Sequence, residues 1–149
     1  MQQGKATQGT IQGLERPIPV PSELTKPFWE AANQKKLVLQ TCTACNKLQY
    51  PPRQSCNRCS SKAPLVWKEV KGQGHIDVYF VIRDSRIRGF RSAQPINFAI
   101  ITLDEDPGIN FLSNLPGTPA GKVPIGAAVE LVFEPAGAGQ LVHEWRVVK

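Results

Sequence analysis

The sequence contains no apolar run that approaches the roughly 20 residues of a membrane span. Its first residues, from Met1 to Gln8, also lack the apolar core of a secretory signal. These absences predict a cytoplasmic protein that makes no membrane contact. In that compartment thiols stay reduced and can hold a metal ion instead of pairing in disulfides.

Common catalytic motifs are absent as well. The sequence has no Gly-x-Ser-x-Gly, no P-loop and no phosphate-binding Gly-x-Gly-x-x-Gly. Its two histidines, His75 and His143, lie in or beside predicted strands, and no pattern ties either of them to a nucleophile. We interpret both as packed or hydrogen-bonded side chains, with a general base as the alternative.

Length and composition set the scale of the fold. The 149 residues suffice for one core or for two small units that share one, and 41% hydrophobic with 20% charged residues indicate a globular chain. The formal net charge of +6 suits an anionic partner. Charge alone leaves three kinds of partner open: nucleic acid, a phosphorylated cofactor and an acidic protein surface.

All four cysteines fall into two close pairs, Cys42 with Cys45 and Cys56 with Cys59. Two residues between thiols let both sulfurs of one turn face one ion, and a second such turn completes the tetrahedron that Zn²⁺ prefers. Four thiolates leave no open coordination position, so we expect a structural zinc rather than a catalytic one. Because this site uses every thiol in the sequence, no cysteine remains as a nucleophile.

The chain divides into three predicted parts: an extended arm over residues 1–20, a helix plus zinc ribbon over 21–62, and a β-barrel domain over 63–149. The arm is rich in Gln, Gly and Pro and shows no periodicity. Ser22 to Gln34 is predicted to be helical. In this helix Phe28 and Trp29 either pack on the domain behind them or anchor a partner protein, and the partner interface is the more specific hypothesis.

From Leu65 onward, short apolar stretches alternate with Gly and Pro turns, so the fold is predicted to be mainly β. We expect strands at Leu65–Lys71, Ile76–Ile82, Phe98–Leu103, Ile109–Leu112, Val129–Phe133 and Leu141–Val147. In the second strand Ile76, Val78, Phe80 and Ile82 are expected to share one face, and the third strand to be buried on both sides. About 85 residues of this kind suit an OB-fold, although periodicity alone also allows another small barrel or a sandwich.

A basic segment lies between two of the predicted barrel strands. It carries Arg83, Arg86, Arg88 and Arg91 with one acid, Asp84. Arginine forms bidentate bonds to phosphate oxygens and stacks on flat rings. The segment is therefore predicted to contact the phosphates of a nucleotide-like ligand or of nucleic acid. The alternative is a surface loop that is solvated or that pairs with acids on a protein partner.

The order of these features resembles the DUF35 family. The resemblance rests on Pro27-Phe-Trp-Glu-Ala-Ala32, on Lys36-Leu-Val-Leu-Gln-Thr-Cys42, and on the cysteine pairs that flank Tyr50-Pro-Pro-Arg53. It continues in Gly72-Gln-Gly74-His-Ile-Asp-Val-Tyr-Phe-Val and in Pro124-Ile-Gly126 before the last strands, and so covers about residues 20–148. It implies an N-terminal helical piece, a rubredoxin-like zinc ribbon and a C-terminal OB-fold. Asn46 stands where the family often has Gly, and Asn tolerates the left-handed backbone of such a turn.

The resemblance also implies a function. Members of the family accompany thiolase-superfamily subunits that make or break carbon–carbon bonds in acyl-CoA substrates. For this chain it implies a non-catalytic accessory subunit with a structural Zn²⁺, a thiolase-like protein partner in a hetero-oligomer, and a coenzyme A thioester as shared ligand. We favour a thiolase of aromatic degradation, such as a benzoylsuccinyl-CoA thiolase, over a steroid aldolase, because the sequence carries no fused hydratase-like domain.

On this hypothesis Arg83, Arg86, Arg88 and Arg91 meet the phosphates of CoA. The rival hypothesis is a nucleic-acid-binding protein, since zinc ribbons and OB-folds both bind nucleic acid. Base stacking needs exposed aromatic side chains, but only Phe90 lies within the arginine segment, so nucleic acid is disfavoured. A catalyst that acts alone is the third possibility, and it conflicts with the commitment of every thiol to metal.

Overall fold

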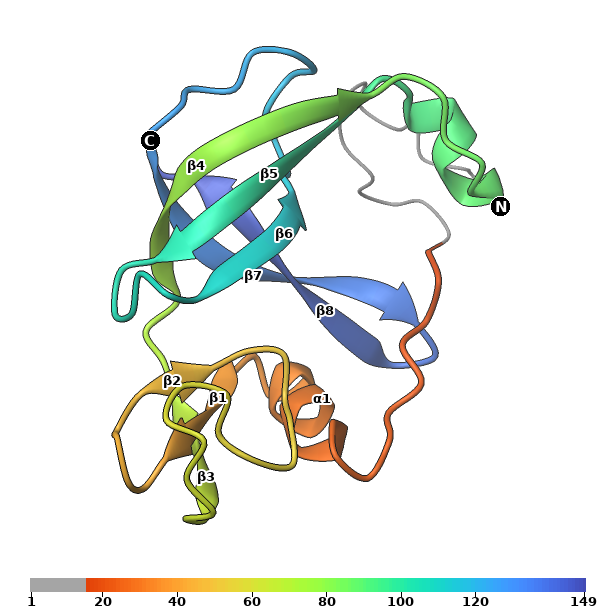
Figure 1. The fold of residues 1–149 in the computed structure, drawn as a ribbon. Helices are drawn as coiled ribbons and strands as arrows, with labels where there is room; N and C mark the ends of the chain where they lie inside the picture. The colour runs from red at the N-terminus through yellow and green to blue at the C-terminus, as the bar shows by residue number, and fades with distance from the viewer. Residues whose placement is uncertain (1–15) are drawn as a thin grey trace.

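The computed structural model describes residues 16–149, so most of the predicted arm lies outside the described residues. Figure 1 shows two units, a small three-stranded sheet with one helix beside it and a larger five-stranded barrel. This mainly β architecture agrees with the predicted fold class. No helix within residues 16–149 is both long enough and apolar enough to cross a membrane.

The helix α1 spans Lys26–Asn33 and is shorter than the predicted helix. The segment before it forms a turn instead, in which Ser22 and Thr25 exchange hydrogen bonds: Ser22 N donates to Thr25 Oγ1 over 2.9 Å, and Thr25 N donates to Ser22 O over 3.0 Å. Short hydroxyl side chains compete in this way with helical hydrogen bonding. Lys35, with a φ of 59°, follows the helix and turns the chain towards the small sheet.

The small sheet contains β1 (Val38–Cys42), β2 (Leu48–Gln49) and β3 (Leu65–Glu69), in the order β2-β1-β3. The strand β3 lies antiparallel to β1, with Val38 opposite Glu69 and Cys42 opposite Leu65. The hydrogen bonds of β3 belong to the ribbon, and the barrel strands begin after it. The predicted boundary between the ribbon and the barrel unit at residues 62 and 63 stays a prediction.

The barrel contains five antiparallel strands. They are β4 (Gln73–Ile82), β5 (Ile96–Leu103), β6 (Asn110–Asn114), β7 (Ala128–Gly137) and β8 (Gln140–Val147), with the 3₁₀ helix η1 (Arg88–Ala93) between β4 and β5. The order in the sheet is β6-β5-β4-β7-β8. The two outermost strands meet where Trp145 N donates a hydrogen bond to Ser113 Oγ over 2.8 Å, so the sheet curls into the closed shape of an OB-fold.

The facial pattern of β4 differs from the prediction. A bulge between Ile76 and Val78 shifts the register, and the bulged residue Asp77 has no single partner on β5. As a result Ile76 is 1% exposed in the core, whereas Val78 and Phe80 are 46% and 43% exposed on the outside. The four residues from Ile76 to Ile82 therefore do not share one face.

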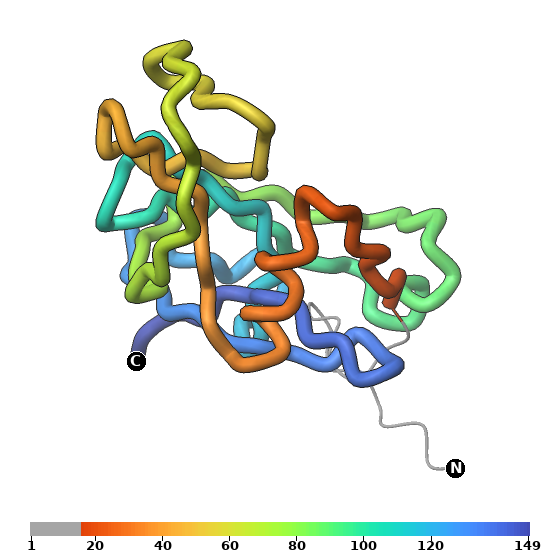
Figure 2. Tube along the Cα trace, turned by 90° about the horizontal axis from the view of Figure 1, so that it is seen from below, coloured from red at the N-terminus to blue at the C-terminus, as the bar shows by residue number. Residues whose placement is uncertain are grey.

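The two units share one core. The ring of Tyr50 from the ribbon packs between Phe28 of α1 and Phe111 of β6, with ring centroids 5.8 and 4.6 Å away, and Phe111 also packs on Trp145. Figure 2 shows α1 lying along the β7–β8 hairpin, where Leu141 N donates a hydrogen bond to Asn33 Oδ1 over 2.9 Å. The ribbon is thus fixed on the barrel by apolar packing.

Candidate metal centre

The four cysteines converge at the end of the small sheet. Cys42 ends β1, Cys45 follows in the next turn, and Cys56 and Cys59 lie in a second turn before β3. All four sulfur atoms lie within 4.8 Å of one another, and individual Sγ–Sγ distances are 3.8 Å for Cys42–Cys59 and 3.9 Å for Cys45–Cys56. A tetrahedral zinc with bonds of about 2.3 Å requires sulfurs about 3.8 Å apart, so the site fits this ion.

The local backbone explains why the sulfurs point inward. Asn46 adopts a φ of 56°, as expected for the residue after the first cysteine pair, and Ser60 has the same φ after the second pair. The backbone N–H groups of Cys59 and Arg58 face the Cys56 sulfur and lower the pKa of this thiol to about 6. At Cys56 the thiolate, which is the form that binds metal, is thereby favoured. At Cys59 a backbone hydrogen bond from Ser61 lowers the pKa of the thiol, but burial and the neighbouring cysteine sulfurs outweigh it and raise that pKa.

A buried pair of glutamines supports the second cysteine turn. No sequence motif predicts this pair. Gln40 and Gln49 lie opposite each other on β1 and β2, and Gln49 Nε2 donates to Gln40 Oε1 over 2.8 Å. Gln40 Oε1 also accepts from Arg53 N over 2.8 Å, and Gln49 Oε1 accepts from Asn57 N over 3.0 Å. Two side chains of the sheet thus hold the backbone on both sides of Cys56.

The arginine segment does not approach the metal centre. It joins β4 to β5 at the far end of the barrel, where η1 packs through the buried Phe90 and Ala93 on Ile96 and Phe98. All four arginines are exposed, and within residues 16–149 none of them has an acidic partner. Arg88 and Arg16 line a shallow groove of about 230 Å³ together with Pro17, Ile87 and Gly89.

The structure separates the two aromatic residues of α1. Phe28 is 4% exposed and packs edge-on against Trp29 and His143, with ring centroids 4.9 and 5.7 Å away. Its side chain is thus part of the core, in agreement with the packing alternative, and is not displayed to a partner. Trp29 is only partly buried and stays a candidate contact.

The histidines are packed or hydrogen-bonded. His143 lies among the rings of Phe28, Tyr50 and Phe111, and burial lowers its pKa to about 4. The exposed His75 meets Asp104, with Nδ1 3.1 Å from Oδ1. Neither histidine lies beside a thiol, so the general-base alternative finds no nucleophile here.

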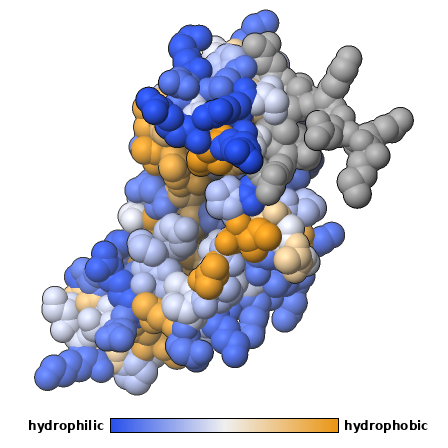
Figure 3. Space-filling view, turned by 90° about the vertical axis from the view of Figure 1, so that its right-hand side faces the viewer, coloured by the Kyte–Doolittle hydropathy of each residue, from blue (hydrophilic) through white to orange (hydrophobic). Residues whose placement is uncertain are grey.

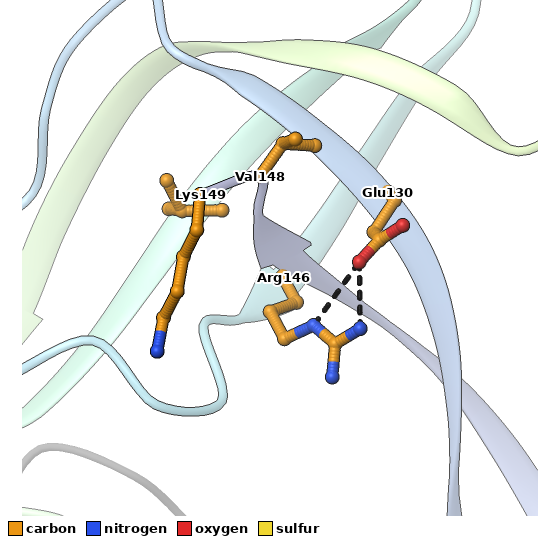
Figure 4. Close-up of a pocket in the computed structure, with 5 residues that line it drawn as sticks. Glu130, Arg146, Val148 and Lys149 are labelled. Carbon is orange, nitrogen blue, oxygen red and sulfur yellow. Dashed lines mark hydrogen bonds and ion pairs between the residues drawn. The ribbon is translucent and has the colours of Figure 1, made fainter.

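A second groove, of about 350 Å³, lies at the end of β8 and involves none of the predicted site residues. Figure 4 shows Glu130, Arg146, Val148 and Lys149 around it. Arg146 donates from Nη2 and Nε to Glu130 Oε1 over 2.6 and 3.2 Å. This guanidinium therefore already has a carboxylate partner within the groove.

Together, the barrel topology and the four-sulfur cluster define a zinc-ribbon protein with an OB-fold. Two family models match the chain: residues 29–64 match the ChsH2 rubredoxin-like zinc ribbon domain, and residues 67–134 match the ChsH2 C-terminal OB-fold domain. The chain belongs to the DUF35 family, with both of these domains.

Similar proteins agree with this placement. A probable enoyl-CoA hydratase alpha subunit from Thermomonospora curvata is 34% identical over 131 residues, which is 85% of this chain; the match spans 39% of the length of that relative. The solved Ltp2-ChsH2(DUF35) aldolase is 28% identical with a TM-score of 0.75, covering 87% of this chain and 98% of that one. A DUF35 protein of unknown function from Sulfolobus solfataricus shares the fold at 21% identity, with a TM-score of 0.59 and coverage of 85% and 87%.

Proposed function

We propose that this chain is a non-catalytic accessory subunit of a thiolase-superfamily enzyme that acts on acyl-CoA substrates. The observation that carries the proposal is the gathering of all four thiols into one metal site. Carbon–carbon cleavage by thiolysis needs an activated cysteine beside a base. This chain supplies no uncommitted cysteine, so the reacting groups come from a companion subunit.

The relatives support a role in a complex. One of them is the Ltp2-ChsH2(DUF35) aldolase, whose name joins two components, and another is named as a subunit of a probable enoyl-CoA hydratase. For this chain we propose a thiolase-like companion, with an aromatic acyl-CoA such as benzoylsuccinyl-CoA as the substrate class.

The arginine segment is the proposed contact for the CoA part of the substrate. CoA carries a pyrophosphate and a 3′-phosphate, and arginine binds phosphate oxygens in a bidentate manner. The four exposed guanidinium groups, which have no acidic partner within residues 16–149, support this role. The nucleic-acid alternative is weakened because Phe90, the one aromatic residue within the segment, is only 7% exposed and cannot stack on a base.

The test begins with the tagged full-length chain purified from its native host, followed by identification of the companion by mass spectrometry. Acyl-CoA cleavage is then measured for this chain, for the companion and for the complex. We expect no turnover by this chain and full turnover only by the complex. Cleavage by this chain alone, or a companion outside the thiolase superfamily, would overturn the proposal.

The CoA contact is tested separately in the complex. Arg86→Glu and Arg91→Glu are expected to raise KM for the acyl-CoA by about tenfold or more, because each reverses a charge near the phosphates. Arg53→Glu is the matched control, since it makes the same charge change at an exposed position on the ribbon. Equal effects of all three variants would show that net charge alone matters.

A further inference from the structure

The outer surface of three barrel strands is apolar. Along β5 and β6 the side chains of Ala99, Ile101 and Phe111 turn into the core, where each is at most 1% exposed. By alternation, their neighbours turn outward. The outward residues of this sheet region include Val78, Phe80, Phe98, Ile100 and Leu112, which we call the outer apolar face; polar residues border it, with Asn114 opposite Phe98 and Asn110 opposite Thr102.

These residues form continuous rows across the strands. Val78 lies opposite Ile100, which in turn lies opposite Leu112, while Phe80 lies opposite Phe98. The two phenylalanine rings are stacked, with centroids 5.9 Å apart and planes at 16°. The solvated face of an antiparallel sheet is normally polar, so an exposed apolar face of this extent indicates a binding surface.

The arginine segment borders the outer apolar face. Arg83 directly follows β4, and η1, which carries Arg88 and Arg91, packs on Phe98 through Phe90. Figure 3 shows the side of the molecule that lies at the right in Figure 1, where strongly hydrophilic residues gather at the top with hydrophobic residues next to them. The surface is therefore apolar in its middle and cationic along one edge.

We infer that the outer apolar face binds the companion subunit, through a protein surface that is apolar in its centre and acidic where it meets the arginine segment. The identity of the companion rests on the proposed function, whereas the face and its chemistry rest on the rows described here. An apolar centre with a charged rim is the usual anatomy of a protein interface.

Two other occupants fit less well. None of the five side chains of the face is polar, so a nucleotide or sugar lying across it would leave its hydrogen-bonding groups unpaired. A second copy of this chain would carry the same net charge of +6, and two such chains repel each other during association. A partner with carboxylates opposite the arginines gains from the same charges.

This placement has a consequence for the proposed CoA contact. If the companion covers the outer apolar face, the arginine segment lies at the seam between the two subunits. Guanidinium groups at such a seam that do not pair with carboxylates of the companion can hold the phosphates of a thioester whose acyl group enters the companion. The accessory chain then contributes to substrate binding without approaching the reacting carbon atoms.

Photo-crosslinking in the native host tests the inference. A benzophenone amino acid replaces Leu112 in the full-length chain, and in a control it replaces Ile125, which is equally exposed at 58% but lies outside the face. We expect Leu112 to crosslink to one companion chain, within an apolar segment flanked by Asp and Glu, and Ile125 to give far less product. A crosslink at Leu112 to a second copy of this chain, equal crosslinking from both positions, or none from either would overturn the inference.

The same experiment distinguishes this inference from the proposed function. If position 112 crosslinks to a thiolase-superfamily chain, both are supported. If it crosslinks specifically to an apolar, acid-flanked segment of a protein from another superfamily, the binding face is supported and the proposed function fails. If a thiolase-like companion co-purifies but position 112 does not touch it, the proposed function stands and the inference fails.

Affinity measurements with the purified companion complete the test. Leu112→Asp is expected to raise Kd at least about tenfold, because it places a charge in an apolar contact and faces an acidic rim. Ile125→Asp, which makes a similar change at equal exposure, is expected to stay within about twofold of wild type. Thermal unfolding of each variant verifies folding, and equal Kd values for the two variants would contradict the inference.

Discussion

Arg16 and Glu144 form a buried ion pair between the start of the described chain and the last strand. Arg16 Nη1 lies 2.9 Å from Glu144 Oε1, and both side chains are less than one-tenth exposed. The Ser113 hydroxyl donates to Glu144 Oε2 over 2.8 Å. Burial nevertheless raises the pKa of Glu144 to about 7, against the opposing effects of Ser113 and Arg16. This carboxyl group therefore titrates near neutral pH.

The first prediction concerns the pH dependence of folding. The native carboxyl of Glu144 keeps its proton up to about pH 7, whereas in the unfolded chain it loses it near 4.5, so the native state binds more protons between these values. The contribution of the Glu144 carboxyl group to stability is present below its pKa in the unfolded chain. It is lost as the pH rises through its pKa in the native state. Wild type should lose about 3 kcal/mol of unfolding free energy as the pH rises from about 5 to about 8. Glu144→Gln should not show this loss.

Urea denaturation at several pH values measures this difference. Glu69→Gln serves as the control for loss of a carboxyl group, because Glu69 is exposed at the surface of the ribbon. Parallel profiles for wild type and Glu144→Gln would contradict the prediction.

The neighbouring residue His143 should act in the opposite direction. Burial holds it neutral in the native state, with a pKa of about 4, whereas the unfolded side chain takes up a proton near 6.5. Its contribution to stability is present above the unfolded value and is lost as pH falls through the native value. Wild type should therefore lose about 3 kcal/mol of unfolding free energy as the pH falls from about 7 to about 4. His143→Leu should not show this loss.

Thermal unfolding across the acid range checks the effect of His143→Leu. His75→Leu is the matched control for loss of an imidazole, because the His75 side chain is half-exposed. If His143→Leu and His75→Leu both keep the wild-type loss of stability at acid pH, burial of His143 is not the cause of that loss.

Sequence reasoning succeeded where the determining interactions are local. The spacing within each cysteine pair and the left-handed Asn46 depend on a few consecutive residues, and both were predicted. The turn that joins β7 to β8 is local in the same way, since it depends on Gly137 and Gly139, which have φ values of 130° and 77°.

Sequence reasoning failed where the structure of a segment depends on its pairing with a distant segment. The bulge at Asp77 exists only because β4 pairs with β5, and it moves Val78 and Phe80 from the expected core face to the outside. The pairing of β3 with β1 likewise joins segments that are distant in the sequence. Arg16 and Glu144 are separated by 128 positions, so no sequence window contains both.

A further prediction concerns the buried glutamine pair beside the metal centre. Gln49→Met removes the side-chain amide of a residue that is 1% exposed. The variant loses the hydrogen bond from Asn57 N to Gln49 Oε1, which holds the backbone next to Cys56. Replacement of a residue that orients metal ligands typically lowers metal affinity by about 10- to 100-fold. We expect a loss of zinc affinity in this range, measured by competition with a chromogenic chelator.

The control for this variant is Gln54→Met, at an exposed position in the same loop. It changes the same residue type without removing a buried hydrogen bond, and should leave zinc affinity within about twofold of wild type. If Gln49→Met also keeps wild-type affinity, the glutamine pair stabilises the sheet without positioning the ligands.

The last prediction concerns removal of the metal. Because binding energy at a structural zinc site contributes to folding, on the order of 10 kcal/mol in small zinc domains, chelation should unfold the ribbon. Tyr50 would then leave its contact with Phe111, whose ring lies 4.6 Å away in the barrel core, so the barrel should also lose stability. We expect metal analysis to find a single zinc ion per chain, and calorimetry to show a lower Tm after chelation, with the same result for Cys45→Ser. A zinc-free protein with an unchanged unfolding transition would mean that the ribbon holds its shape through the shared aromatic core alone.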